Sequence, residues 1–372
     1  MQFARVAYTL SFTLALVFVV LSGSALASSL CSLGWPSALF DGLTVCTSSI
    51  GWAMAMRLSM TYAVYHALLT LLTAGASGDH SVTLFKAFHR RWFFWKNLIL
   101  AGGAFGSMFI GNTFFSSSYV YISYVGSAVF LVCQMVLLLL LAYRLTIAVS
   151  SAKVPALNIL YLAVSFGLYG FGLFLKVMNI VWHHSEDTRS VVVCGVSMAL
   201  DILALVLSLT SGSGAALPPG VWAAVTGVYI SQGVYSAVGA APWAWWLPTL
   251  SWTISILLVV TVFLVCMSEM SFDPLFDAGE CDLDEMEGLD SEDDDDEDSD
   301  TVSYHYFMYH LVMTVASLFM PFSVSGSGTG ATQTWDFWVM CGGALLTGLL
   351  FSWTLSAPRL FPHRTFGQKS LY

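Results

Sequence analysis

Ten apolar stretches recur along the chain, each of about 20 residues or more, the length an α-helix needs to cross the hydrocarbon core of a bilayer. They lie at about residues 7–27, 49–74, 92–111, 118–149, 156–182, 189–210, 220–240, 245–268, 303–323 and 335–357. Most of the 13 lysines and arginines fall on one side of these stretches: Arg5, Lys86, Arg90, Arg91, Lys96, Arg144, Lys153, Arg359, Arg364 and Lys369. Because short loops rich in Lys and Arg stay cytoplasmic, the pattern predicts an all-α, polytopic membrane protein with about ten transmembrane helices and both termini cytoplasmic.

Composition supports this class. Hydrophobic residues make up 57% of the chain, charged residues 10%, and the mean hydropathy is +0.76. A soluble domain has roughly 45–50% apolar and about 25% charged residues. We therefore expect a single membrane domain over residues 1–372, located in the plasma membrane or an endomembrane.

The net charge of -10 comes from one loop. Of the 23 acidic residues, 16 lie between Asp273 and Asp300, where there is no basic residue. Such a segment cannot bury a core, so it predicts a disordered cytoplasmic loop at about residues 270–301. Ser291 and Ser299 lie among its carboxylates and are candidates for phosphorylation. A docking surface for basic trafficking adaptors and a plain solvated linker are the alternative interpretations.

The first apolar stretch has two interpretations. Arg5, the apolar run 6–21 and the small residues Ala25 and Ala27 also fit a cleaved secretory signal peptide. We favour an uncleaved span, because the apolar run is long for a signal peptide.

The fourth stretch is longer than a membrane requires. It has no proline, and no charge before Arg144. A continuous helix of roughly 30 residues would be about 45 Å long, against a core of about 30 Å. It would have to tilt or project into the cytoplasm, unless a normal span is followed by an amphipathic interfacial stretch.

The cysteine pattern predicts one disulfide. Of the seven cysteines, only Cys31 and Cys46 share a non-cytoplasmic loop, where oxidising conditions permit a bond. There is no CxxC and no His/Cys spacing typical of zinc, so we expect neither metal nor cofactor.

Polar residues within or at the ends of the spans are candidates for a lipid-headgroup track, because an uncompensated charge costs at least ~2.5 kcal/mol at the bilayer centre. These candidates are Arg57, Gln134, Lys176, Asp201, Gln232, Tyr304, Tyr306 and His310. Lys176 and Asp201 lie at overlapping depths on antiparallel neighbours, so we expect them to pair.

Each candidate also has a structural interpretation. Arg57 and Lys176 could snorkel, the glutamines could bridge helices, and the residues that open the ninth span could form an aromatic belt. Asp201 is too short to snorkel from mid-span. It is either a structural partner of Lys176, which we favour, or part of a hydrophilic path.

Ordered motifs in the last two spans resemble the Serinc (serine incorporator) family. They are VSYHY at 302–306, HL at 310–311, ASL at 316–318, WV at 338–339 and WTLSAP at 353–358. Gln134 in the fourth span and Tyr229 in the seventh are similar to further family positions. Leu140 departs from the pattern, because the family often has an aspartate there.

The resemblance implies two helix bundles crossed by a long oblique fourth helix, with lipid-accessible grooves. It also implies either passive movement of phospholipids between leaflets or binding of lipids as a scaffold. The alternative is an accessory factor that promotes incorporation of serine into phosphatidylserine and sphingolipids. A solute transporter is a weaker alternative, since no inverted repeat with glycine-broken helices is detected.

No residue set in the spans fits an enzyme that joins serine to a lipid. The carboxylates outside the acidic run are scattered singly or beside loops: Asp41, Asp79, Glu186, Asp187, Asp201, Glu269 and Asp336. We therefore expect no intrinsic catalysis. The expected partners are membrane phospholipids, with lipid-synthesis enzymes, trafficking adaptors and a second copy of the chain as further candidates; nucleic acid is not expected.

Overall fold

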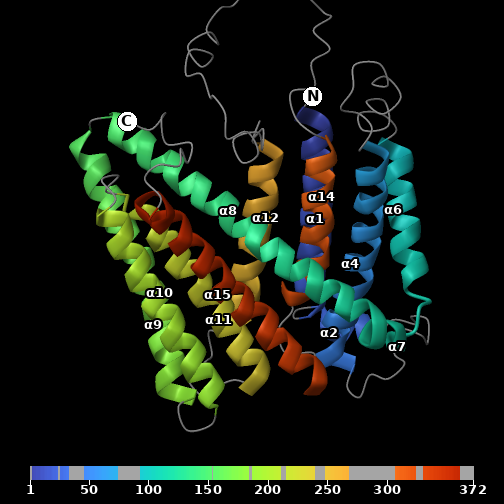
Figure 1. Cartoon of the computed structure of the whole chain (residues 1–372). Helices are drawn as coiled ribbons and strands as arrows, with labels where there is room; N and C mark the ends of the chain where they lie inside the picture. The colour runs from blue at the N-terminus through green and yellow to red at the C-terminus, as the bar shows by residue number, and fades with distance from the viewer. Residues whose placement is uncertain are drawn as a thin grey trace, which may run out of the picture.

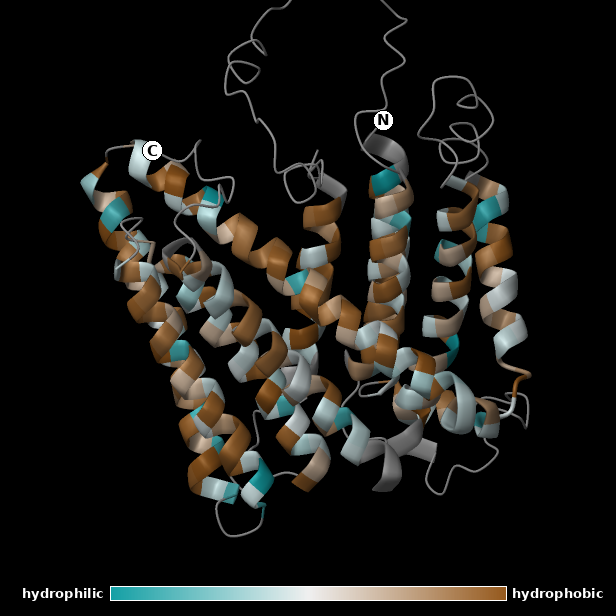
Figure 2. Ribbon diagram, viewed as in Figure 1, coloured by the Kyte–Doolittle hydropathy of each residue, from teal (hydrophilic) through white to brown (hydrophobic). Residues whose placement is uncertain are grey.

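The computed structural model describes ten segments of the chain: residues 2–23, 26–32, 46–73, 93–152, 154–183, 187–210, 215–238, 248–267, 306–323 and 330–360. Within them the regular structure is helical and there is no strand. Helices suit hydrocarbon because they satisfy every backbone polar group internally. Figure 2 shows hydrophobic residues over most of the helical surface, with isolated hydrophilic positions between them.

The helices are α1 (Gln2–Ser22), α2 (Ala27–Ser32), α4 (Cys46–Thr73), α6 (Phe93–Ser107), α7 (Asn112–Phe114), α8 (Val120–Ala152), α9 (Pro155–His183), α10 (Thr188–Thr210), α11 (Leu217–Val238), α12 (Pro248–Met267), α14 (Tyr306–Phe319) and α15 (Gly330–Leu360). A π-helical turn (Phe115–Tyr119) joins α7 to α8, and a 3-10 turn (Met320–Ser323) follows α14.

Each predicted apolar stretch contains one of the longer helices, so an all-helical protein with several apolar helices is confirmed. Five described segments are long and apolar enough to cross a membrane: Arg5–Ser22, Asn112–Ala152, Pro155–His183, Thr188–Thr210 and Thr334–Ala357. Trp252–Val265 and Phe307–Phe322 are shorter apolar helices. The count of ten membrane spans stays a prediction.

Prolines explain two boundaries that differ from the predicted ones. Helix α14 ends at Phe319, before the predicted 323, because Pro321 cannot continue the α-helical hydrogen-bond pattern. The carbonyl of Leu318 instead accepts bonds from the Ser123 and Ser127 hydroxyls of α8, at 2.6 and 3.1 Å. Helix α11 begins at Leu217, earlier than predicted, because prolines are tolerated in a first helical turn.

The fourth stretch forms one long helical segment. It runs without a break from Asn112 to Ala152, longer than the predicted 118–149, and at ~1.5 Å per residue spans about 60 Å. In Figure 1 it crosses the other helices obliquely, from α7 at the lower right to the upper left.

The remaining helices pack in two groups. Helices α9, α10 and α11 contact one another and α15 packs against α10 and α11, while α1, α4, α12 and α14 form the second group with α6 against α4. Helix α8 contacts α14, α12, α11 and α15, and therefore touches both groups. The Gln134 side chain of α8 links the two groups by hydrogen bonds, because its amide donates to Thr261 of α12 at 2.8 Å and accepts from Tyr229 of α11.

Several predicted features lie outside the described residues. They are the acidic segment 270–301 with Ser291 and Ser299, the whole of Tyr304, and the side chains of Tyr306 and Cys46. Cys31 is disulfide-bonded, and its pairing with Cys46 stays a prediction.

Candidate functional site

The buried face of α9 is polar, although the helix lies among apolar neighbours. Its residues recur at alternating spacings of four and three, which places them on one helix face. In order they are Ser165, Tyr169, Gly172, Lys176, Asn179 and His183, and all are buried; Gly172 is small rather than polar, and the apolar Leu175 is buried beside them. The opposite face is exposed and apolar, with large side chains such as Phe166, Phe171 and Phe174. Helix α9 is thus polar towards the protein and apolar towards its surroundings.

Helix α10 repeats the pattern. Its matching buried series of polar and small residues is Ser190, Cys194, Ser197, Asp201, Ala204 and Ser208, with the apolar Val193 buried beside them. Each series runs for about 27 Å at ~1.5 Å per residue, close to the ~30 Å thickness of the hydrocarbon core. We call the two series together the polar stripe. Its length is therefore close to the distance that a membrane-spanning helix has to cross.

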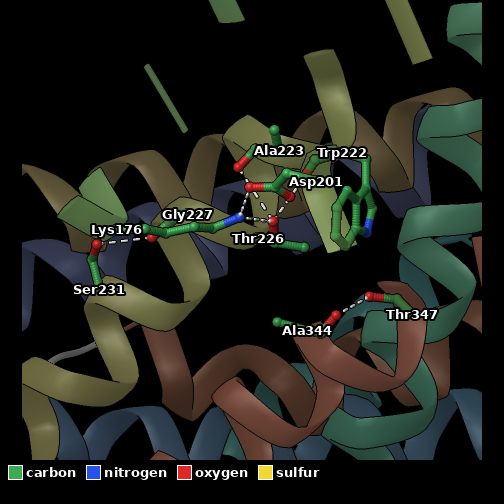
Figure 3. Close-up of polar contacts among 9 residues, drawn as sticks. All are labelled: Lys176, Asp201, Trp222, Ala223, Thr226, Gly227, Ser231, Ala344 and Thr347. Atoms are coloured by element: carbon green, nitrogen blue, oxygen red, sulfur yellow. Dashed lines mark hydrogen bonds and ion pairs between the residues drawn. The ribbon is translucent and has the colours of Figure 1, made fainter. Parts of the chain in front are cut away.

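An ion pair lies near the middle of the polar stripe. The Lys176 ammonium donates to Asp201 Oδ2 at 2.6 Å and to Thr226 Oγ1 of α11 at 2.9 Å (Figure 3). Both charged side chains are 0% exposed. The ammonium also lies 5.3 Å from the centre of the Trp222 ring. The structure therefore brings Lys176 and Asp201 together, as their depths suggested.

Hydrogen bonding around the pair is incomplete. Asp201 Oδ1, the Tyr169 hydroxyl and the Ser197 hydroxyl are buried and have no partner among the described residues. Tyr169 lies within electrostatic range of Asp201, and Ser197 is one turn before Asp201 on the same face. A buried polar atom without a partner costs about 1–3 kcal/mol, so this part of the stripe favours a polar ligand.

Direct backbone contact fixes α9 against α11. A Cβ atom at Gly172 would overlap the carbonyl oxygen of Ala223, and one at Gly220 would lie 2.5 Å from the carbonyl oxygen of Ser165. Asn179 of α9 adds a hydrogen bond of 2.8 Å to Ser231 of α11. Lys176 and Thr226 are thus held on one rigid helix pair, while Asp201 is on α10.

The two glutamines differ. Gln134 bridges α8, α11 and α12 with both ends of its amide paired, which fits the structural interpretation. Gln232 is buried on α11, and its Oε1 has no partner in the described part of the chain.

Arg57 does not snorkel, because its side chain is 0% exposed. Its guanidinium donates to the carbonyls of Ala53 and Ile110, at 3.0 and 2.6 Å, and to Asn112 Oδ1 at 2.8 Å. It also lies 4.7 Å from the centre of the Phe115 ring. Since Ile110 and Asn112 flank the turn between α6 and α7, Arg57 fixes that turn.

His310 lies inside the protein and not in an aromatic belt. It is 0% exposed, and its Nδ1 lies 3.1 Å from Nδ1 of His66 on α4. The Tyr8 ring packs edge-on against both imidazoles. The structure therefore separates His310 from the polar stripe, because it belongs to the other helix group.

The sequence interpretation missed four residues near the pair: Tyr169, Asn179, Ser197 and Thr226. The missed signal was the spacing of polar and small residues along the fifth and sixth spans, which alternates by four and three. Thr226 had no such signal, since only packing brings α11 to the pair. The described residues hold no cluster of three metal-binding side chains.

Apolar helices that enclose polar side chains define a multi-pass membrane protein. The sequence model of the Serine incorporator (Serinc) family matches residues 1–267 and 266–364, so the chain belongs to the Serinc family. It is also similar to a protein of Monosiga brevicollis called "Probable serine incorporator", at 27% identity over 210 residues. That match covers 53% of this chain and 43% of the relative's length.

Proposed function

We propose that this Serinc protein moves phospholipids passively between the two leaflets of its membrane. The observation that supports the proposal is the polar stripe on α9 and α10, whose length of about 27 Å is close to the ~30 Å thickness of the hydrocarbon core. A lipid headgroup needs such a line of polar contacts to pass the bilayer centre, because a charged group there is costly.

The polar stripe is closed in this conformation, so movement requires helices to separate. Helices α9 and α11 touch backbone to backbone at Gly172 and Gly220 and move as one unit. Helix α10 is the element that can leave, and it carries Asp201 away from Lys176. The ion pair stabilises the closed conformation, since separating buried charges costs several kcal/mol per ion.

Burial of the polar stripe in the closed conformation also supports a second candidate function. A closed polar interior also fits a small polar molecule, and this supports an accessory role in which the protein supplies serine to lipid-synthesis enzymes. A lipid-binding scaffold would use the stripe without transfer, and a solute transporter remains the weaker alternative. In all these roles the chain is proposed to be non-catalytic, to lie in the plasma membrane or an endomembrane, and to have both termini cytoplasmic.

The test is leaflet exchange by the purified protein. Liposomes that contain the full chain and a tail-labelled phospholipid are treated with a membrane-impermeant quencher. In protein-free liposomes the quencher reaches only the label in the outer leaflet, which is about one half of the total fluorescence. With the protein present, and without nucleotide or partner proteins, we expect more than half of the fluorescence to be quenched. Exchange at the protein-free rate by monodisperse protein would contradict lipid movement and favour the accessory role.

A further inference from the structure

The ion pair of the polar stripe leaves one carboxylate oxygen without a hydrogen bond, whereas its ammonium makes two. Lys176 is engaged by Asp201 Oδ2 and Thr226, and it lies against the Trp222 ring. Asp201 uses only Oδ2, because Oδ1 has no partner among the described residues. The carboxylate end can therefore accept hydrogen bonds from a ligand before the pair separates.

The cost of separating the pair restricts the charge of the ligand. A ligand that is only anionic would bind Lys176 and leave Asp201 as an unpaired buried charge. A ligand that is only cationic would leave Lys176 unpaired. Since each unpaired ion costs several kcal/mol, only a ligand with both charges can replace the two partners together.

The surroundings of Asp201 select the kind of cation. Asp201 Oδ1 and the nearby hydroxyls of Ser197 and Tyr169 are oxygen atoms that accept hydrogen bonds. A primary ammonium group offers three N–H donors to them, whereas a quaternary ammonium offers none. An aromatic face could bind a quaternary ammonium instead, but the Trp222 ring is already engaged by Lys176.

We infer that the Lys176–Asp201 pair recognises zwitterions that combine a primary ammonium with a phosphate or carboxylate. The anionic group binds Lys176 and Thr226, and the ammonium binds Asp201 with Ser197 and Tyr169. The ethanolamine headgroup of a phospholipid and free serine share this chemistry. For a lipid the inference rests on the proposed function; for a free amino acid it does not.

The experiment compares headgroups in liposomes that contain the full chain. Tail-labelled phosphatidylethanolamine, phosphatidylcholine and phosphatidylglycerol report exchange separately, and binding of radiolabelled serine is measured on the protein in detergent. We expect ethanolamine lipid to exchange about tenfold faster than the other two, equivalent to about 1.4 kcal/mol. In Asp201→Asn this preference should fall to less than twofold.

If Asp201→Asn does not fold, a second variant tests the same prediction. Lys176→Met combined with Asp201→Leu removes both charges, and such apolar replacements of a buried pair are tolerated. It should stay monodisperse and lose the headgroup preference. The matched control is Arg144→Gln, which neutralises an exposed cation on α8 and should keep the preference.

The outcomes separate the two proposals. Equal exchange of all three lipids would leave lipid movement standing and overturn zwitterion recognition. If no lipid exchanges, lipid movement fails. Serine binding that the double variant abolishes would then support recognition of the free zwitterion, and the absence of such binding would overturn it.

Discussion

Two buried cations, one in each helix group, have different hydrogen-bond partners. Arg57 donates to two backbone carbonyls and an amide oxygen around a turn, whereas Lys176 donates to a carboxylate and a hydroxyl on two other helices. The planar fork of arginine suits several fixed acceptors, while the lysine ammonium is a point charge on a flexible stem. The comparison indicates that Arg57 fixes structure and that Lys176 is part of an exchangeable contact.

The largest effect is expected from breaking the ion pair on one side. Lys176→Met leaves Asp201 buried without its counterion and should lower the free energy of unfolding by about 3–5 kcal/mol. The double variant Lys176→Met/Asp201→Leu should recover most of that loss. Thermal unfolding in detergent measures both. A double variant as unstable as the single one would contradict the exchangeable role of the pair.

Arg57→Lys tests the other side of the comparison. A lysine cannot reach all three acceptors of the guanidinium, and hydrogen bonds to charged groups contribute about 1.5–3 kcal/mol each, so a loss of about 2–4 kcal/mol is expected. Arg144→Lys, at an exposed position, is the control and should change little. Equal melting temperatures for both variants would show that the fork geometry is unimportant.

Gly172→Ala tests whether α9 and α11 form one unit. The added methyl would overlap the Ala223 carbonyl, so we expect a loss of about 1–3 kcal/mol and weaker support for Lys176. Gly170→Ala is the control on the same helix, because a Cβ there meets nothing within 4 Å. The proposed rigid pair would be wrong if Gly172→Ala unfolded at the same temperature as this control.

The smallest effect is expected at Asp187, which directly precedes the apolar segment Thr188–Thr210. Asp187 caps α10 by accepting bonds from the Arg189 amide and the Ser190 hydroxyl, and a lost cap costs about 1 kcal/mol. Burial raises the pKa of Asp187, but hydrogen bonds from Ser190 and Arg189 outweigh burial and hold it below 3.8. The contribution is therefore complete above pH 3.8 and is lost as the pH falls through the lower folded pKa.

The check is the unfolding midpoint of Asp187→Ala against that of the unchanged protein over the acidic range. The difference should shrink as the pH falls from 3.8 through the lower folded pKa, below which the carboxyl group is protonated in both folded and unfolded states. A difference that grows on acidification would reverse the assigned sign. Arg189→Gln, which keeps the cap, should have the smaller effect at neutral pH, because surface ion pairs contribute little.

Much of the fold followed from hydropathy, since apolar length alone requires helices in a membrane. Hydropathy did not place all helix ends correctly. The end of α14 is set by Pro321 and by the hydrogen bonds of two α8 serines to the Leu318 carbonyl. The depths of Lys176 and Asp201 also allowed their pairing to be predicted. By contrast, nothing local indicated that His310 would meet His66, because they are 244 positions apart in sequence.

The sequence by itself determined the class of protein, the apolar helices and the membership of the Serinc family, because these depend on composition and order along the chain. The tertiary structure decided which polar residues share an environment. Only packing places α11 between α9 and α15 and so brings Thr226 to the ion pair. Packing also brings the Arg57 guanidinium to the carbonyl of Ile110, at the turn between α6 and α7. Such contacts depend on helix rotation and close approach, which hydropathy does not encode.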